Sequence, residues 1–352
     1  MYKQCNQLNN QTTKQPDNTN VFLFIDILLL ISSMLATCEI SVKIIKRHPN
    51  ILPLWRITIA VNKKHQLEKM TYEQITSTQN PKIKKLLQLQ QKSSERRKAG
   101  LFVVEGQREV ERCAMKDYEI DSIFFCRNIA KSAQPELNDT TEHLLEKLQR
   151  EGKVRIFEIS KEVYSKIAYR ESTEGVVAEV RTKDMKLEDL GIDESGMKNG
   201  HAPLLVVLEG VEKPGNLGAI LRTADASGAD AVIVCDPRTD LYNPNLIRSS
   251  TGGIFSVPCV ACTSEECIAF LKAKGIKILT AQLQDSSLYY DTDMRCGTAI
   301  VMGTEATGLT DIWRKAADAH IRIPMLGILD SLNVSVSAAV LLFEAVRQRD
   351  RF

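Results

Sequence analysis

The chain has 352 residues, of which 43% are hydrophobic and 26% are charged, a composition that excludes a disordered or fibrous protein. The length favours two domains, because single domains usually hold about 100–200 residues. The net charge is only +2, so a nucleic-acid partner requires a local cluster of basic residues. Nine cysteines, an odd number, argue against a secreted disulfide framework and favour the cytoplasm.

The first residues differ from the rest of the chain. Residues 21–36 (VFLFIDILLLISSMLA) are strongly apolar, but Asp26 interrupts them, and they fall short of the ~20 residues of a membrane span. A signal sequence and a weak anchor are alternatives, and residues 35–38 loosely imitate a lipoprotein cleavage site. Because Met70 opens a segment of ordinary composition, we favour the hypothesis that residues 1–69 come from an upstream start. We expect no stable membrane association, and a mature N-terminus before Met70 would contradict the hypothesis.

Residues 70–182 have the pattern of a small α/β domain. Residues 101–104 form an apolar strand pattern, a turn and a helix follow, and residues 123–125 form another strand pattern. A basic stretch with a single acid, Glu95, precedes them. Its candidates for phosphate contacts are Lys82, Lys84, Lys85, Arg96, Arg97 and Lys98. The alternative is a solvated helix face.

Residues 183–203 are polar and rich in glycine, which predicts a linker. From Leu204 to the end, strand and helix patterns alternate, which predicts a mostly parallel sheet with helices on both faces. Strands are expected at 204–208, 231–234, 276–281, 298–302 and 319–323. Helices are expected at 217–227, after Thr263, at 310–317 and from about 334 to 348. Thr263 and Glu266 have the spacing of a capping box, and Gly275 stands where a helix ends.

A C-x-x-C motif runs from Cys259 to Cys262, with Cys267 nearby. In the sequence no second pair or histidine cluster completes a set of four zinc ligands. We therefore predict small buried thiols in a strand and the following helix, and no metal. Zinc is the alternative.

Three polar loops follow predicted strands, where parallel sheets bind ligands. The first, residues 209–218, leads into a helix that carries Arg222, with Asn216 placed as its N-cap. Gly218 lies one turn before Arg222 and would allow a ligand to approach the backbone. The second, residues 302–309 (MGTEATGL), surrounds one acid with glycines. The third, residues 323–335 (IPMLGILDSLNVS), leads into the last helix. Capping and surface pairing explain each loop alone, so a functional interpretation requires all three.

In this order, N-L-G-x-x-x-R, G-T-E-x-x-G-L and I-P-M-x-G-x-x-D-S-L-N-V-S resemble the three signature motifs of the SpoU (TrmH-type) RNA 2′-O-ribose methyltransferases of the SPOUT superfamily. The resemblance spans residues 204–349. Residues 80–82 and 102–106 resemble part of the substrate-binding domain that such enzymes often carry. The resemblance implies a deep trefoil knot, S-adenosyl-L-methionine as cofactor, and a homodimer.

The resemblance also implies roles for individual residues. The catalytic positions are Asn216, Arg222, Glu305, Ser331 and Asn333, and all have the expected residue type. The cofactor contacts are Gly303, Glu305, Gly308, Ile323, Met325, Leu332 and Asn333. Arg222 is the family's candidate base, yet a guanidinium normally stays protonated. The alternative is that Arg222 stabilises the forming alkoxide and binds phosphate.

The last helix, 334–349, is apolar on most sides, so we expect it to be buried all round. The subunit's own sheet is one cover for it. Because the resemblance implies a dimer, the hypothesis is that part of the helix forms the homodimer interface. The predicted division is an extension (1–69), an RNA-binding domain (70–182), a linker (183–203) and a methyltransferase domain (204–352). Large-subunit ribosomal RNA is the preferred substrate, with transfer RNA as the alternative. A non-catalytic RNA-binding or ribosome-assembly protein is a third possibility. A dinucleotide-dependent oxidoreductase is a weaker competitor, because the full G-x-G-x-x-G is missing.

Overall fold

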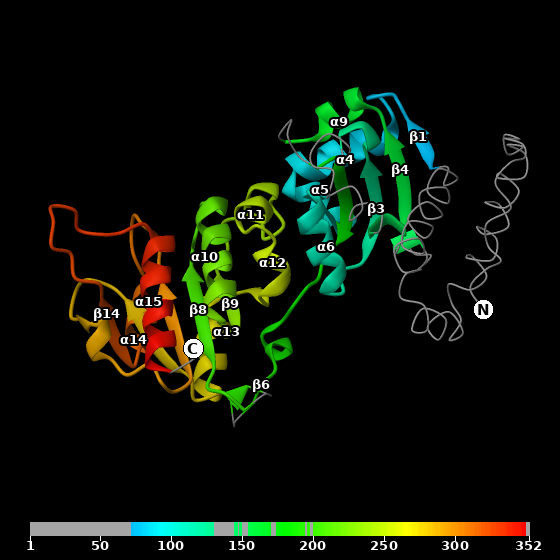
Figure 1. Cartoon of the computed structure of the whole chain (residues 1–352). Helices are drawn as coiled ribbons and strands as arrows, with labels where there is room; N and C mark the ends of the chain where they lie inside the picture. The colour runs from blue at the N-terminus through cyan, green and yellow to red at the C-terminus, as the bar shows by residue number, and fades with distance from the viewer. Residues whose placement is uncertain are drawn as a thin grey trace, which may run out of the picture. The chain divides into compact units, whose positions relative to one another are not determined.

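The computed structural model describes residues 72–129, 144–146, 148–149, 154–169, 174–193, 196–197 and 200–349 (Figure 1). Glu73–Phe352 forms one compact unit. The apolar segment 21–36 and the proposed start at Met70 lie outside the described residues. Within the described ranges, no helix has both the length and the apolar character needed to cross a bilayer.

The first sheet has five strands in the order β1-β4-β3-β5-β2. Its strands are β1 (Glu73–Ile75), β2 (Leu101–Glu105), β3 (Ile120–Phe125), β4 (Arg155–Ile159) and β5 (Val176–Arg181). The helices of this part are α4 (Pro81–Gln91), α5 (Ser93–Ala99), α6 (Gln107–Met115) and α9 (Lys161–Ile167). β5 pairs antiparallel with β2 and β3, whereas β4 pairs parallel with β1 and β3. The two strands expected from the sequence, 101–104 and 123–125, are β2 and the end of β3.

Helix α4 shows why the basic residues near its start lie at the surface. Asn80 caps the helix by accepting a hydrogen bond from the backbone N–H of Lys82, and Pro81 occupies the first turn, where its missing N–H costs nothing. Ile83, Leu86 and Leu89 are fully buried in the core beneath the sheet. Each such side chain contributes about 1.5–3 kcal/mol by leaving water. The lysines between them are therefore turned outward.

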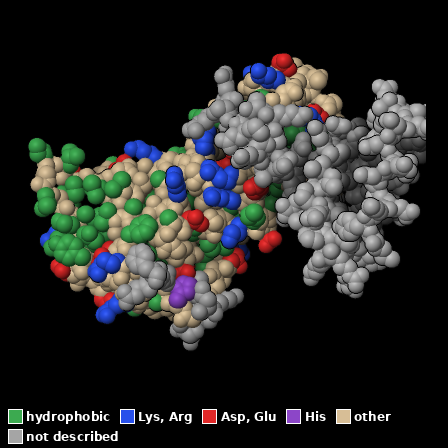
Figure 2. Space-filling view, viewed as in Figure 1, with side chains coloured by type: hydrophobic (Ala, Val, Ile, Leu, Met, Phe, Trp, Pro, Cys, Tyr) green, Lys and Arg blue, Asp and Glu red, His purple; other side chains and the backbone are tan. Residues whose placement is uncertain are grey.

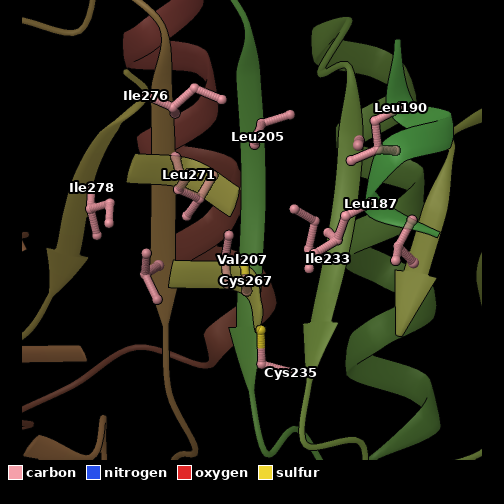
Figure 3. Close-up of a cluster of buried hydrophobic side chains, with 14 of the residues drawn as sticks. Leu187, Leu190, Leu205, Val207, Ile233, Cys235, Cys267, Leu271, Ile276 and Ile278 are labelled. Carbon is pink, nitrogen blue, oxygen red and sulfur yellow. The ribbon is translucent and has the colours of Figure 1, made fainter. Parts of the chain in front are cut away.

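Residues 183–193, which were expected as part of a linker, contribute to the core of the second sheet. They form a 3-10 helix, η2 (Leu187–Leu190), and the strand β6 (Ile192–Asp193), which pairs with β7 (Gly196–Met197). Leu187 and Leu190 pack into the same apolar cluster as Leu205 and Ile233 (Figure 3). Glycines and charges in this segment conceal a short apolar pattern, so a simple linker does not describe it fully.

The second sheet has seven strands in the order β10-β9-β8-β13-β11-β14-β12. They are β8 (Leu204–Glu209), β9 (Ala231–Cys235), β10 (Cys259–Cys262), β11 (Lys277–Ala281), β12 (Ser287–Leu288), β13 (Thr298–Met302) and β14 (Ala319–Arg322). Every neighbouring pair is parallel, which confirms the predicted fold class. The deep knot stays a prediction.

Helices and short turns connect these strands. They are α10 (Pro214–Ser227), α11 (Pro244–Ser249), α12 (Gly253–Ser256), α13 (Ser264–Ala273), η3 (Tyr289–Asp291), α14 (Asp311–Ala316) and α15 (Val334–Gln348). Leu205 and Val207 of β8 share an apolar cluster with α13 and α14, whereas α10 and α15 pack against each other and bury separate side chains. The capping box of Thr263 and Glu266 is confirmed, and Gly275 has the left-handed φ of +62° expected after a helix.

The start of α10 differs from the expectation. Asn216 was expected as the N-cap, but the N-cap is Lys213 and the helix begins at Pro214, three residues earlier than expected. Proline is favourable at the first helical position because its φ is already helical and it has no N–H to leave unpaired. The side chain of Asn216 is therefore not used for capping and is free to take part in other contacts.

Candidate functional site

The three loops meet at the carboxyl edge of the second sheet. The first loop (210–213) follows β8, the second (303–310) follows β13, and the third (323–333) follows β14. β8 and β13 are hydrogen-bonded neighbours, and because all strands are parallel their carboxyl ends lie at the same edge. Glu209, at the end of β8, is buried and accepts hydrogen bonds from the backbone N–H and hydroxyl of Thr310 at 2.9 and 2.6 Å. This contact joins the first loop to the second.

The second loop folds back tightly on itself. The backbone N–H of Gly308 donates to the carbonyl of Thr304 at 3.0 Å, and the hydroxyls of Thr304 and Thr307 lie 2.8 Å apart. A Cβ at Gly303 would lie 2.3 Å from the backbone of Gly308, so no larger residue fits there. Gly308 itself has a φ of +66°. Both glycines are therefore needed to shape the loop that carries Glu305.

Glu305 is the centre of a network that joins all three loops. Its Oε1 accepts hydrogen bonds from the amide Nδ2 of Asn216 at 3.0 Å and from that of Asn333 at 2.7 Å. Its Oε2 forms an ion pair with Lys213 at 2.9 Å. Asn333 Nδ2 also lies 3.3 Å from Oδ1 of Asn216. We call Lys213, Asn216, Glu305 and Asn333 the Glu305 network.

Asn333 has two roles in this network. Its Oδ1 accepts from the backbone N–H and the hydroxyl of Ser335 at 3.0 and 2.6 Å, which caps α15. Its amide nitrogen is thereby turned toward Glu305. The start of the last helix is thus fixed to the second loop by one side chain.

The charge of Glu305 is stabilised by its partners. The hydrogen bond from Lys213 is the largest cause that lowers the pKa of Glu305, and the amide of Asn216 lowers it further. The same ion pair raises the pKa of Lys213. Glu305 is therefore a carboxylate at neutral pH, which suits positioning and electrostatic roles better than acid catalysis.

A cavity of about 390 Å³ lies beside the network. This volume falls within the range of about 300–1,000 Å³ for small-molecule sites. The predicted site residues that line it are Gly303, Glu305, Gly308, Ile323, Met325, Ser331 and Leu332. Val334 and Leu341 of α15 add apolar surface. Asn216 and Asn333 are held next to the cavity through Glu305.

The cavity also has a wall that sequence reasoning missed. Residues 281–284, after β11, and Arg314 of α14 line it. The Oε1 of Gln282 and the Nε of Arg314 are buried and have no hydrogen-bond partner among the described residues. Both residues line the cavity, and a buried acceptor or donor that stays unpaired costs free energy. The 281–284 loop has no glycine motif, so only its place after a strand signalled it.

The remaining predicted catalytic residues lie apart from the network. The hydroxyl of Ser331 is 3.4 Å from the carboxylate of Asp330, and Ser331 is exposed at the cavity. Arg222 is exposed on α10 and has no hydrogen-bond or ion-pair partner within the described part of the chain. Its guanidinium is available to an external ligand.

Gly218 serves packing, contrary to the expected ligand approach. It is buried, and a Cβ there would lie 1.9 Å from the hydroxyl of Ser249 and 2.7 Å from the carbonyl oxygen of Leu246. The absence of a side chain therefore lets α10 lie close to α11. The sequence could not distinguish these two uses of a helical glycine.

The basic stretch is only partly available to RNA. Lys84, Arg97 and Lys98 are exposed. Lys82 pairs with Glu73, and Lys85 pairs with Glu179 at 3.2 Å. Arg96 does not fit the RNA-binding prediction, because it is 3% exposed and its guanidinium donates to Asp240 and to the carbonyl of Leu89, each at 2.6 Å. A buried guanidinium that is paired with Asp240 is not available to phosphate, so Arg96 has a structural role.

Residues 203–343 match the SpoU rRNA Methylase family, and residues 80–178 match the MRM3-like substrate binding domain. A 23S rRNA (guanosine-2′-O-)-methyltransferase, RlmB, from Pseudomonas syringae is 38% identical over 177 residues, which cover 50% of this chain and 70% of that protein. The chain belongs to the SpoU rRNA methylase family.

Two further relatives are similar to this chain over most of its length. The 23S rRNA (guanosine(2553)-2′-O)-methyltransferase RlmP of Bacillus subtilis is 27% identical over 271 residues, covering 77% of this chain and 98% of that protein. The SpoU methyltransferase AviRb from Streptomyces viridochromogenes, solved with AdoMet, is 26% identical with a TM-score of 0.66, covering 78% and 100% of the two chains. The protein is thus an RNA ribose methyltransferase that uses S-adenosylmethionine.

Proposed function

We propose that the enzyme methylates the ribose 2′-hydroxyl of a guanosine in large-subunit ribosomal RNA. The observation that carries this proposal is the Glu305 network, which ties the three loops together beside a cavity of small-molecule size. The substrate follows the RlmP and RlmB relatives, each of which is a 23S rRNA guanosine 2′-O-methyltransferase. Transfer RNA is the alternative substrate.

The cavity fits S-adenosylmethionine in its chemistry. Met325, Leu332 and Leu341 offer apolar surface to an adenine, and the tight backbone of the 303–308 loop offers hydrogen-bonding groups. The unpaired acceptor of Gln282 and the unpaired donor of Arg314 suit the hydroxyls, amine and carboxylate of the cofactor. The cofactor supplies a methyl group on a positively charged sulfur.

The network residues are proposed to align the ribose. Alignment of two reacting groups contributes as much as roughly 7–11 kcal/mol to a barrier. Glu305 holds the amides of Asn216 and Asn333 in fixed positions, and Ser331 adds a hydroxyl at the mouth of the cavity. These groups would orient the ribose without changing charge themselves.

Arg222 is proposed to stabilise charge instead of removing the proton. It is exposed, and a guanidinium stays protonated at neutral pH, so it is a poor base. Its planar fork suits a phosphate and the developing alkoxide oxygen of the ribose. This is the second of the two roles left open by the sequence.

The exposed basic residues of helices α4 and α5 are proposed to bind the RNA backbone. Lys84, Arg97 and Lys98 are exposed and would contact phosphates without reading bases. Under this proposal residues 70–182 select the RNA and residues 204–352 carry the chemistry, with 183–203 joining them. Ribosomal RNA is made in the cytoplasm of bacteria, and the protein is proposed to act there.

A second copy of the chain is proposed to cover the apolar surface near the third loop. Seven of the 15 residues of α15 are buried within its own subunit, whereas Val336 and Phe343 are exposed. Leu326, Ile328 and Leu329 are at least 74% exposed. Figure 2 shows hydrophobic side chains gathered on this part of the molecule. A monomeric mass in light scattering at micromolar concentration would contradict the homodimer.

The proposed reaction is tested with methyl-labelled S-adenosylmethionine and either ribosomal or transfer RNA from cells that lack the enzyme. We expect label in the large ribosomal RNA. Label in transfer RNA alone would establish the alternative substrate. If the cofactor neither binds in calorimetry nor transfers a methyl group, the protein is a non-catalytic RNA-binding protein.

A further inference from the structure

Three cysteines from different elements meet on the side of the sheet opposite α10. They are Cys235, the last residue of β9, Cys262, the last residue of β10, and Cys267 in the first turns of α13. Their sulfur atoms all lie within 4.8 Å of one another. β9 and β10 are parallel and place Cys235 directly beside Cys262, and Thr263 turns the chain so that α13 brings Cys267 over them. Figure 3 shows Cys235 and Cys267 among the buried side chains.

The cluster is not the pair that the C-x-x-C motif suggests. Cys259 lies three residues before Cys262 on the same strand and is outside the group of three. The partner that completes the group, Cys235, is 27 positions earlier in the chain than Cys262 and has no local motif. The sequence alone therefore pointed to two of the three residues only.

The geometry suits a metal better than simple packing. Sulfur atoms bound to one zinc at about 2.3 Å lie about 3.8 Å apart, so small side-chain rotations close the observed separations. Cys235 and Cys267 are fully buried, whereas Cys262 is partly exposed and provides an entry side. The three sulfur atoms already lie together, within 4.8 Å of one another, so no change of the backbone is needed to bring them to one ion.

The surroundings would stabilise the negative charge of bound thiolates. Cys267 is in the first turns of α13, a helix of 10 residues, whose N-terminal end carries partial positive charge. The carboxylate of Asp236 is already used, because it accepts from the hydroxyl of Ser264 at 2.6 Å and from the Ser264 backbone N–H. It fixes the start of α13 in the way outer partners fix metal ligands.

We infer that Cys235, Cys262 and Cys267 form a binding site for a thiophilic d¹⁰ cation, with zinc as the physiological ion. Binding of Zn²⁺ displaces three thiol protons and leaves the fourth coordination position, on the side of Cys262, to water. The ion would join the carboxyl ends of β9 and β10 to the first turn of α13. This inference is independent of the substrate RNA.

The test uses the full chain, purified under reducing conditions and stripped of metal with a chelator. Addition of Co²⁺ is expected to produce the near-ultraviolet band of sulfur-to-cobalt charge transfer, and Zn²⁺ is expected to remove it at about one equivalent per chain. The Cys262→Ser variant is expected to bind at least ~100-fold more weakly and to lose the rise in Tm that zinc produces. Cys259→Ser, on the same strand, is the matched control and is expected to behave like the unchanged chain.

A second measurement on the unchanged chain does not depend on a variant folding. Zinc is expected to protect three thiols from an alkylating reagent, and mass spectrometry of the peptides should assign them to Cys235, Cys262 and Cys267. Absence of the cobalt band, equal zinc affinity of Cys262→Ser and the unchanged chain, or protection of other cysteines would each overturn the inference. A disulfide within the cluster together with no metal binding would show an oxidisable thiol group instead.

Discussion

The loops around Glu305 and the basic helices α4 and α5 both carry charged residues that the sequence singles out, but they hold these charges differently. In the loops, each polar side chain is fixed by others from distant parts of the chain, as Asn333 is by Glu305 and Asn216. On the helices, Lys84, Arg97 and Lys98 face solvent singly. A mutually bonded site should fail when one member changes, whereas a dispersed surface should lose affinity in small steps.

The largest effect is expected for Glu305→Gln. This change removes the ion pair with Lys213 and leaves one acceptor oxygen for three donors, so Lys213, Asn216 and Asn333 can no longer all be held in place. Misplacement of such groups costs roughly 10²-fold in rate, measured as kcat/KM in a methyl-transfer assay. Glu212→Gln is the control, because Glu212 is exposed at the same edge and forms its ion pair with Arg238, outside the Glu305 network. Near-normal turnover of Glu305→Gln would contradict the expectation that the mutually bonded site fails when one member changes.

A smaller loss is expected for Arg222→Lys. The change keeps the positive charge but removes the planar fork that is proposed to contact phosphate and alkoxide together. We expect kcat to fall by about 10- to 100-fold with little change in cofactor binding, since one charge-assisted hydrogen bond is worth about 1.5–3 kcal/mol. Turnover close to that of the unchanged enzyme would refute both the stabilising and the base role of Arg222.

Gln282→Leu tests the wall that the sequence did not reveal. Its Oε1 is buried without a partner among the described residues and is proposed to accept a hydrogen bond from the cofactor. We expect the Kd for S-adenosylmethionine to rise by about tenfold, as for the loss of one hydrogen bond, while RNA binding is unchanged. Gln284→Leu, two residues further along the same loop and also lining the cavity, is the control. Equal cofactor affinity of all three proteins would remove Gln282 from the site.

Single substitutions of the exposed basic residues on α4 and α5 are expected to lower the affinity for RNA in small steps. Lys84→Ala, Arg97→Ala and Lys98→Ala are each expected to reduce the slope of log affinity for RNA against log salt by about 0.9. Lys272→Ala, an exposed lysine on α13, should leave the slope unchanged. If none of the three changes alters the slope of log affinity against log salt, these basic residues do not contact RNA.

The smallest effect is expected from pH in the neutral range. The pKa of Glu305 is lowered by Lys213, so its carboxylate and the network persist at neutral pH and are lost only as pH falls through that lowered pKa. The acid limb of the pH–rate profile should move to higher pH in Lys213→Met. An acid limb that stays in place in this variant would show that Lys213 does not hold the charge of Glu305.

The difference between the loops around Glu305 and the basic helices also explains how much of the structure the sequence could predict. Alternating patterns identified five of the seven strands of the second sheet to within a few residues, because buried parallel strands are continuous apolar runs. The two-residue strand β12 was not predicted, and β10 was expected only as a strand that holds cysteines. The glycines at 303 and 308 were assigned to a ligand loop, and their backbone geometry supports that shape. The catalytic roles of Asn216, Arg222, Ser331 and Asn333 remain proposals.

What the sequence missed depends on contacts between distant residues. Nothing local shows that Arg96 turns inward to Asp240, that Lys213 meets Glu305, or that Gly218 packs against Ser249. Charge and residue type are local, but the face of a helix that becomes buried depends on what packs against it. The same limit concealed Cys235 as the third member of the cysteine cluster.

The most direct test of the account is the chemical identity of the product. Labelled RNA from the reaction would be digested to nucleosides and analysed by mass spectrometry, with the Glu305→Gln variant in parallel. We predict 2′-O-methylguanosine from large-subunit ribosomal RNA with the unchanged enzyme and little product with the variant. A methyl group on a base, or equal yields from the two proteins, would contradict the claim that the Glu305 network directs ribose methylation.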